Sequence, residues 1–130
     1  MAVGILLVTH TGLGNALIEA ARGVVGPLPL AVEAVEFANG DSAEATLHRA
    51  ARCMRGLDAG AGVLVLTDLY GSTPSNIGAQ LASQGTLVRR VSGLNLPMLL
   101  RVLNYADQEL AELALTAAAG ARNGVILDTA

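Results

Sequence analysis

The sequence predicts an α/β fold in which helices cover both faces of an open, mainly parallel β-sheet. Short apolar runs alternate along the chain with longer segments whose apolar residues recur with a helical period. Glycine or proline stands at most junctions, and the central apolar runs are continuous, as expected for strands buried on both faces. With 130 residues and 52% hydrophobic content the chain can bury one core, so we expect residues 1–130 to form a single domain.

Five segments have the length and composition of strands. The first four are rich in Val, Ile and Leu, whereas the fifth, near the carboxyl end, has only a weak pattern. We expect these strands at residues 3–9, 30–36, 62–67, 86–91 and 124–127.

The first two helices have clear sequence boundaries. A helix at residues 14–25 carries an apolar stripe on one face and is stopped by Gly26 and Pro27. A second helix begins after the polar segment 39–42, which can supply an amino-terminal cap, and its buried face includes Leu47.

Three further helices are expected after Pro74, after Pro97 and at residues 108–121. Proline suits a first helical turn because its missing N–H would have no partner there. The last helix is rich in alanine, and small side chains allow a close approach to a sheet or a partner helix. This helix and the fifth strand are therefore candidates for a dimer contact, although an ordinary terminal helix would show the same composition.

The composition argues against several classes of ligand. Aromatic residues make up 2% of the chain, and the formal net charge is −3. Nucleic-acid binders rely on aromatic stacking or clustered cations, so no nucleic-acid partner is expected. The only cysteine, Cys53, has no grouping with zinc spacing, which indicates no metal site and a reducing cytoplasm. No segment approaches the ~20 apolar residues of a spanning helix, so no direct membrane insertion is expected.

His10 and Asp68 each follow a predicted strand, and we interpret them as the reactive pair. In an open α/β sheet, ligands bind beyond the carboxyl ends of the strands, where the strand order reverses. We therefore expect the Asp68 carboxylate to approach the His10 imidazole. A carboxylate bonded to one ring nitrogen fixes the tautomer and directs the other nitrogen, which can then attack phosphorus.

Helix amino termini are expected just after both residues, at positions 12–15 and 73–75, where unpaired N–H groups could bind an anion. For a phosphoryl group on His10, the donors would be N–H groups around Gly71, Ser72 and Thr73 together with the Thr73 hydroxyl. Neither loop contains Lys or Arg, which argues against a P-loop and is compatible with a carrier that holds its phosphoryl group lightly. No cofactor is expected.

Each of these residues also has a simpler interpretation. His10 could be a capping or surface residue, and Asp68 could cap the turn that follows it. His48 is expected on the solvent-facing side of its helix. Ser72 could join His10 and Asp68 in a hydrolase triad, but no Gly-x-Ser-x-Gly elbow surrounds it.

Four strings of residues resemble the enzyme IIA domains of the mannose-type sugar phosphotransferase system, and the likeness extends along essentially the whole chain. The third and fourth strings are the most specific in their order and spacing. The strings are Val-Thr-His-Thr-Gly at 8–12, Asn-Gly-Asp at 39–41, Thr-Asp-Leu-Tyr-Gly-Ser-Thr-Pro-Ser-Asn at 67–76 and Gly-Leu-Asn-Leu-Pro-Met-Leu at 93–99.

The resemblance implies a flavodoxin-like sheet and a cytoplasmic phosphotransferase that acts as a phosphocarrier. In such a protein His10 accepts a phosphoryl group from the phosphorylated histidine of HPr and donates it to a IIB domain. By position, Asp68 matches the family's carboxylate partner of that histidine, and Thr73 matches its hydroxyl in the phosphate loop. Family members form homodimers by exchanging the last strand, which would lie antiparallel here, and any association with a membrane permease would run through IIB.

One departure from the family concerns Ser72, which stands where the family usually has a second glycine. If that position requires a left-handed backbone, serine would cost ~1 kcal/mol.

Two alternative functions share these features. A phosphocarrier subunit of a dihydroxyacetone kinase resembles this fold in its first domain, although the string at 71–76 favours the sugar system. A regulatory protein without a transport role could instead use phosphorylation as its switch for binding a partner. A nucleotide or flavin module would need basic and aromatic contacts that the sequence lacks.

Overall fold

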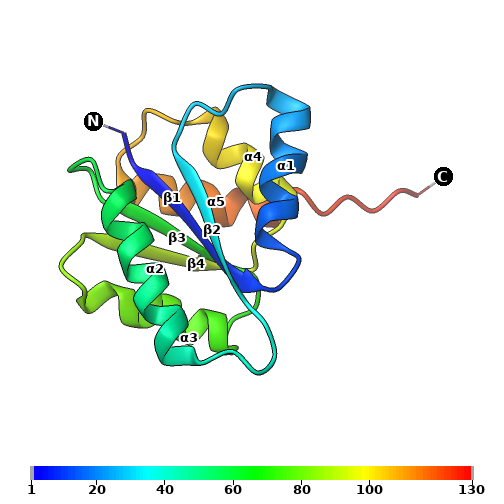
Figure 1. Ribbon diagram of the computed structural model, residues 1–130. Helices are drawn as coiled ribbons and strands as arrows, with labels where there is room; N and C mark the ends of the chain where they lie inside the picture. Colours follow the sequence, from blue (N-terminus) through cyan, green and yellow to red (C-terminus); the bar gives the residue numbers. More distant parts are fainter. Residues whose placement is uncertain (1, 130) are drawn as a thin grey trace.

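The computed structural model describes residues 2–129, and its centre is a four-stranded parallel sheet with helices on both faces (Figure 1). The strands lie in the order β2-β1-β3-β4, and each neighbouring pair is parallel. The predicted open α/β sheet is therefore confirmed. The strands are β1 (Gly4–His10), β2 (Val32–Phe37), β3 (Val63–Thr67) and β4 (Val88–Ser92).

The helices divide into two layers around this sheet. Helices α1, α4 and α5 pack against one face, and α2 and α3 pack against the other (Figure 1). Their bounds are α1 (Gly14–Val25), α2 (Ala43–Leu57), α3 (Thr73–Gln80), α4 (Leu96–Asn104) and α5 (Leu110–Asn123), and a 3-10 turn at Leu81–Ser83 extends α3.

The two central strands are apolar throughout because both of their faces are covered. In β1, Ile5 contributes to the cluster under α1, α4 and α5, whereas its neighbour Leu6 contributes to the cluster under α2 and α3. Leu64 and Val65 of β3 alternate in the same way. All four side chains are fully buried, and burial of each contributes about 1.5–3 kcal/mol relative to an exposed position.

Short polar side chains cap the amino termini of α2 and α4. The Ser42 hydroxyl accepts a hydrogen bond from Ala45 N–H (3.1 Å) at the start of α2, where the sequence predicts a cap. At the start of α4, the Asn95 side-chain oxygen accepts from Met98 N–H (2.8 Å). These bonds satisfy N–H groups that have no partner inside the helix.

The carboxyl end of the chain differs from the sequence prediction. Residues 124–127 do not form a strand, and the side chains of Val125, Ile126 and Leu127 are 77%, 76% and 86% exposed. This segment extends away from the body of the protein (Figure 1). A strand needs a partner for its backbone groups, and within residues 2–129 the segment meets none.

None of the helices within residues 2–129 combines the length and the apolar character that crossing a membrane requires.

Candidate functional site

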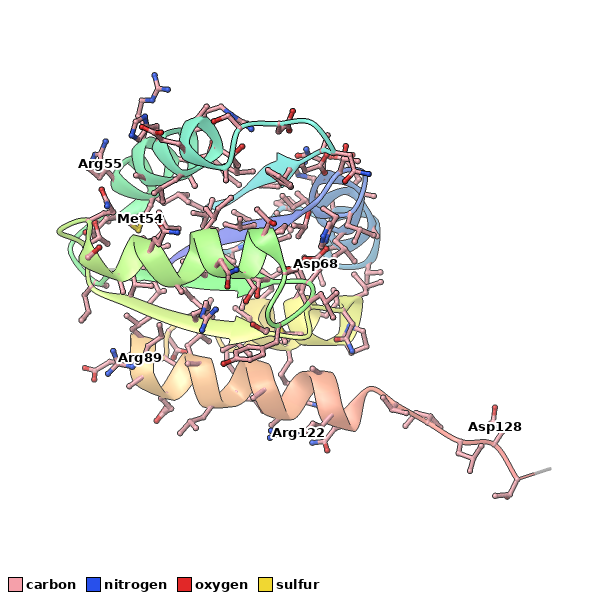
Figure 2. The ribbon with its side chains drawn as sticks, turned by 90° about the horizontal axis from the view of Figure 1, so that it is seen from below. Met54, Arg55, Asp68, Arg89, Arg122 and Asp128 are labelled. Carbon is pink, nitrogen blue, oxygen red and sulfur yellow. The ribbon has the colours of Figure 1, made fainter. Side chains whose placement is uncertain are left out.

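The topology brings the carboxyl ends of β1 and β3 side by side at the point where the strand order reverses. From β1 the chain first adds β2 on one side, and later adds β3 and β4 on the other. His10 is the last residue of β1, and Asp68 directly follows the last residue of β3. Asp68 lies at the edge of the sheet from which α3 starts, while Arg89 lies toward the opposite end (Figure 2).

His10 and Asp68 are in direct contact. The Asp68 Oδ2 atom accepts a hydrogen bond from the backbone N–H of His10 (2.9 Å), and it lies 2.8 Å from Nδ1 of the His10 ring. A carboxylate at this distance favours the tautomer with hydrogen on Nδ1. The other ring nitrogen, Nε2, then carries the lone pair and makes no hydrogen bond within residues 2–129.

The two side chains differ in exposure. The Asp68 side chain is 8% exposed, whereas the His10 side chain is 43% exposed. The second Asp68 oxygen, Oδ1, is buried and meets no donor among the described residues. The carboxylate is thus fixed through Oδ2 behind the ring, and the reactive side of the imidazole faces outward.

The turn that follows His10 is fixed by two side chains. The Thr9 hydroxyl donates to the His10 carbonyl (2.8 Å) and accepts from Gly14 N–H (3.0 Å). The Glu36 carboxylate, at the end of β2, accepts from Gly12 N–H (3.1 Å) through Oε1 and from Asn15 N–H (2.9 Å) through Oε2. Hydrogen bonds from the N–H groups of Asn15 and then Gly12 lower the pKa of Glu36.

These contacts correct one expectation from the sequence. The amino terminus of α1 was expected to offer unpaired N–H groups to an anion, but the N–H groups of Gly12, Gly14 and Asn15 already have partners. A protein carboxylate occupies this anion position. Sequence reasoning missed Glu36 because the residue that faces α1 depends on how β2 is placed beside β1, although its position at the end of a strand was a usable signal.

The backbone of the loop before α3 shows whether Ser72 takes a left-handed conformation. Gly71 has the left-handed backbone conformation (φ +84°), whereas Ser72 has φ −79° and ψ 171°. Ser72 therefore carries no left-handed strain, and it serves as the amino-terminal cap of α3. Its hydroxyl donates to the Leu69 carbonyl (2.6 Å) and accepts from Ser75 N–H (3.4 Å).

The hydrogen bonds within this loop also show which of its N–H and hydroxyl groups remain free to bind a phosphoryl group. The Ser72 N–H donates to the Leu69 carbonyl (3.3 Å), so both donors of Ser72 are already used. Gly71 N–H and the Thr73 hydroxyl make no hydrogen bond in the described part of the chain. Of the three predicted phosphate-binding residues, Gly71 and Thr73 thus keep free donors.

A cation that sequence reasoning missed lies against this loop. The Arg90 Nη1 atom donates to the Ser75 carbonyl and hydroxyl (2.9 Å each), and the guanidinium carbon lies 5.5 Å from the centre of the Tyr70 ring. The loop sequences themselves contain no Lys or Arg. Arg90 comes from β4 instead, so its approach depends on the packing of that strand against α3.

Exposed apolar side chains lie near the pair in sequence. Leu13 is 46% exposed in the turn after β1, and Leu69 and Tyr70 are 61% and 75% exposed after β3. Four surface cavities of about 470, 390, 220 and 320 Å³ lie elsewhere and do not include His10 or Asp68 in their linings. The partly exposed His10 ring and these exposed apolar side chains thus come from the two segments that follow β1 and β3.

One further expectation, the exposure of His48, can be compared with the structure. His48 is exposed on α2, as predicted. Residues 2–129 contain no group of three or more His, Cys, Asp or Glu side chains that could hold a metal ion. The Cys53 thiol is half-buried, and burial together with nearby Glu33 raises its pKa to about 11.

Comparison with known proteins gives consistent matches. The family model EIIA-man, described as the PTS system fructose IIA component, matches residues 4–119. The PTS system mannose-specific EIIAB component of Escherichia coli K12 is 28% identical over 127 residues, which cover 96% of this chain and 39% of that protein. The chain thus spans about two fifths of the length of the curated relatives it matches.

Solved structures show the same likeness across the whole fold. The mannose/sorbose specific IIA subunit of the phosphotransferase system from Enterococcus faecalis has a TM-score of 0.88 and 25% identity, with 100% of this chain and 97% of that chain covered. The PTS IIA protein associated with the fucose utilization operon of Streptococcus pneumoniae has a TM-score of 0.81 and 25% identity, with 98% and 96% covered. On this evidence the chain belongs to the EIIA-man family, the mannose-family IIA components of the sugar phosphotransferase system.

Proposed function

We propose that residues 1–130 act as a single cytoplasmic IIA domain whose His10 carries a phosphoryl group from phosphorylated HPr to a IIB domain. The observation that carries this proposal is the 2.8 Å contact between His10 Nδ1 and Asp68 Oδ2, which leaves Nε2 free on the exposed side of the ring. Family membership supports the reaction class, because these components belong to the phosphotransferase system.

The transfer needs no cofactor in this mechanism. The Nε2 lone pair attacks phosphorus in line with the phosphorus–nitrogen bond of the donor phosphohistidine, that bond breaks, and its electron pair returns to the donor ring. His10 keeps the hydrogen on Nδ1 and becomes a phosphorylated imidazolium, whose positive charge the Asp68 carboxylate stabilises. The reverse steps deliver the phosphoryl group to IIB.

The phosphoryl oxygens would be held by a small number of neutral donors. Gly71 N–H, Thr73 N–H at the first turn of α3 and the Thr73 hydroxyl are suited to this, whereas Ser72 keeps the loop in shape as the helix cap. Because Glu36 fills the other helix terminus, the group has only one such cradle. A small number of hydrogen bonds to the phosphoryl group suits a carrier, because the group must be transferred again to IIB.

The partners would dock on the surface around His10. The exposed apolar residues Leu13, Leu69 and Tyr70 suit contacts with HPr and with IIB in turn. We further propose that a membrane permease is reached only through IIB.

We also propose that the chain forms a homodimer by exchange of residues 124–127. In the described chain β4 pairs with β3 on one side only, and its other edge is unpaired. The backbone of this segment could pair with that edge in a second copy, which would also cover the exposed apolar side chains of Val125, Ile126 and Leu127.

The test is phosphorylation by HPr, enzyme I and phosphoenolpyruvate, followed by mass spectrometry. The wild-type protein should gain one phosphoryl group on His10, in an adduct that is labile to acid and stable to alkali. His10→Ala should gain none, and His48→Ala should behave as wild type because His48 is a surface residue on α2. Labelling of the His10→Ala protein would contradict the proposal.

A second step separates a carrier from a regulator. Addition of a IIB domain should remove the phosphoryl group from His10 at a rate comparable to that of its transfer from phosphorylated HPr to His10. A protein that keeps its phosphoryl group and binds another partner only when phosphorylated would be a regulatory switch instead.

A further inference from the structure

The edge strand β4 carries adjacent arginines that point to opposite faces of the sheet. Val88, two residues before Arg90, packs with the cluster under α2 and α3, whereas Val91 packs with the cluster under α1, α4 and α5. Side chains alternate along a strand, so Arg90 shares the face of Val88, and Arg89 shares the face of Val91. Arg89 accordingly lines a cavity beside the start of α5, far from His10.

Arg90 is fixed to the first turn of α3. Its Nη1 atom donates to both the carbonyl and the hydroxyl of Ser75 at 2.9 Å, and Ser75 is fully buried. Gly78, one turn further along α3, leaves room for the Arg90 stem, since a Cβ atom there would lie 3.3 Å from Arg90 Cδ. The position of the guanidinium is thus determined by buried packing as well as by hydrogen bonds.

The same guanidinium also contacts the beginning of the loop. It lies 5.5 Å from the centre of the Tyr70 ring, within the range of a cation–π interaction, and Tyr70 is 75% exposed. One cation therefore joins the first and last residues of the segment Tyr70–Ser75. Gly71 and Thr73, the residues with free donors, lie between these two contacts.

We propose that Arg90 is a positioning residue that holds the Tyr70–Ser75 loop in the conformation that receives the phosphoryl group. The inference rests on the proposed function, because it assigns the loop the role of phosphate cradle. Arg90 acts through the loop, since its Nη1 is already committed to Ser75. Donors aimed in advance at the developing charge lower the barrier of transfer, and a loop that is free to move loses this advantage.

The kinetic experiment compares Arg90→Met with Arg89→Met. Methionine keeps much of the apolar stem but removes the donors and the charge, and the neighbouring arginine serves as a matched control on the opposite face. Phosphoryl uptake from phosphorylated HPr should fall about tenfold or more in kcat for Arg90→Met with little change in KM, and Arg89→Met should match wild type. Arg90→Lys should recover part of the rate because lysine can still donate to Ser75.

A second readout follows the loop itself. Hydrogen exchange at Ser75 and Asn76 N–H, which bond to Ser72, should become faster in Arg90→Met and remain unchanged in Arg89→Met. Thermal unfolding checks that the variants are folded. An unchanged kcat in a folded Arg90→Met protein would overturn the inference whatever the exchange rates, and a rise in KM alone would overturn it by assigning Arg90 to partner docking instead.

The two proposals can fail separately. If wild-type protein gains no phosphoryl group, the proposed function is wrong and the transfer role of Arg90 falls with it. If wild type is phosphorylated on His10 and Arg90→Met is equally fast, only the inference about Arg90 is wrong.

Discussion

At the scale of single residues, Asp68 and Glu36 are two carboxylates with different tasks around the same turn. Asp68 bonds to the ring and backbone of His10, whereas the Glu36 carboxylate accepts hydrogen bonds from backbone N–H groups of the turn that follows. The first can affect the charge on the imidazole directly. The second acts on the shape of the turn.

Replacement of Asp68 by Asn should slow phosphoryl uptake on the order of 100-fold while the protein stays folded. Asparagine has nearly the same shape, but it lacks the negative charge that stabilises the phosphorylated imidazolium. Rapid-quench measurements with phosphorylated HPr would give the rate. The control is Asp107→Asn, which should react as wild type. Asp107 is exposed and lines the cavity beside the start of α5. An Asp68→Asn protein as fast as wild type would remove the carboxylate from the mechanism.

Replacement of Glu36 by Gln should destabilise the protein by about 1 kcal/mol at pH 7 and by much less near pH 3. The backbone N–H groups of Asn15 and Gly12 lower the pKa of Glu36 in the folded state. Its stabilising contribution is therefore complete above the ordinary glutamate pKa of about 4.3, and it is lost as the pH falls through the lowered folded value. Urea unfolding at the two pH values measures this difference, and an equal loss at both would show that the charge of Glu36 is not involved.

At the scale of elements, the contacts of α1 with β1 and β2 support the turn that follows His10. A Cβ atom at Gly14, the first residue of α1, would lie 2.9 Å from Ala34 Cβ and 3.1 Å from the Thr9 hydroxyl oxygen. Glycine therefore lets the start of α1 lie close to Ala34 of β2 and to Thr9 of β1, whose hydroxyl accepts a hydrogen bond from Gly14 N–H.

Gly14→Ala should lower the free energy of unfolding by about 1–3 kcal/mol because the added methyl group overpacks this contact. Gly23→Ala on the same helix is the matched control, since a Cβ there meets nothing within 4 Å. It should stabilise the protein by up to about 1 kcal/mol through helix propensity. Urea midpoints for the two variants give the comparison, and equal effects at both positions would show that the approach of α1 to β2 is not tight.

At the scale of the whole molecule, the carboxyl-terminal segment 124–127 pairs with no strand of its own chain within residues 2–129. It projects from the body in both views (Figures 1 and 2) and presents consecutive apolar side chains. The unpaired edge of β4 offers backbone groups that such a segment could bond.

Ile126→Asp should convert a dimer into a monomer, measured by sedimentation velocity over a range of concentrations. A charge in the middle of the segment opposes its burial against a second copy. Val24→Asp, at a position 64% exposed on α1, is the control and should remain dimeric. A wild-type protein that sediments as a monomer throughout the range would exclude the exchange.

By itself, the sequence determined the alternation of strands and helices, the parallel sheet and the placement of His10 and Asp68 at strand ends. Periodicity and turn residues are local properties, and the rule for open sheets places residues at strand ends on one edge. Four predicted strands appear in the structure with shifts of a few residues, and the segment 124–127, which lacks a partner strand, does not.

Only the tertiary structure decided which side chains meet around that edge. Glu36 reaches Gly12 and Asn15 across 24 and 21 positions, Arg90 reaches Ser75 across 15, and Asp68 meets His10 across 58. Such contacts depend on the register of neighbouring strands and on which face each side chain shares with a packed helix. The backbone of Ser72 depends likewise on its role as a helix cap, because Gly71 takes the left-handed conformation in its place.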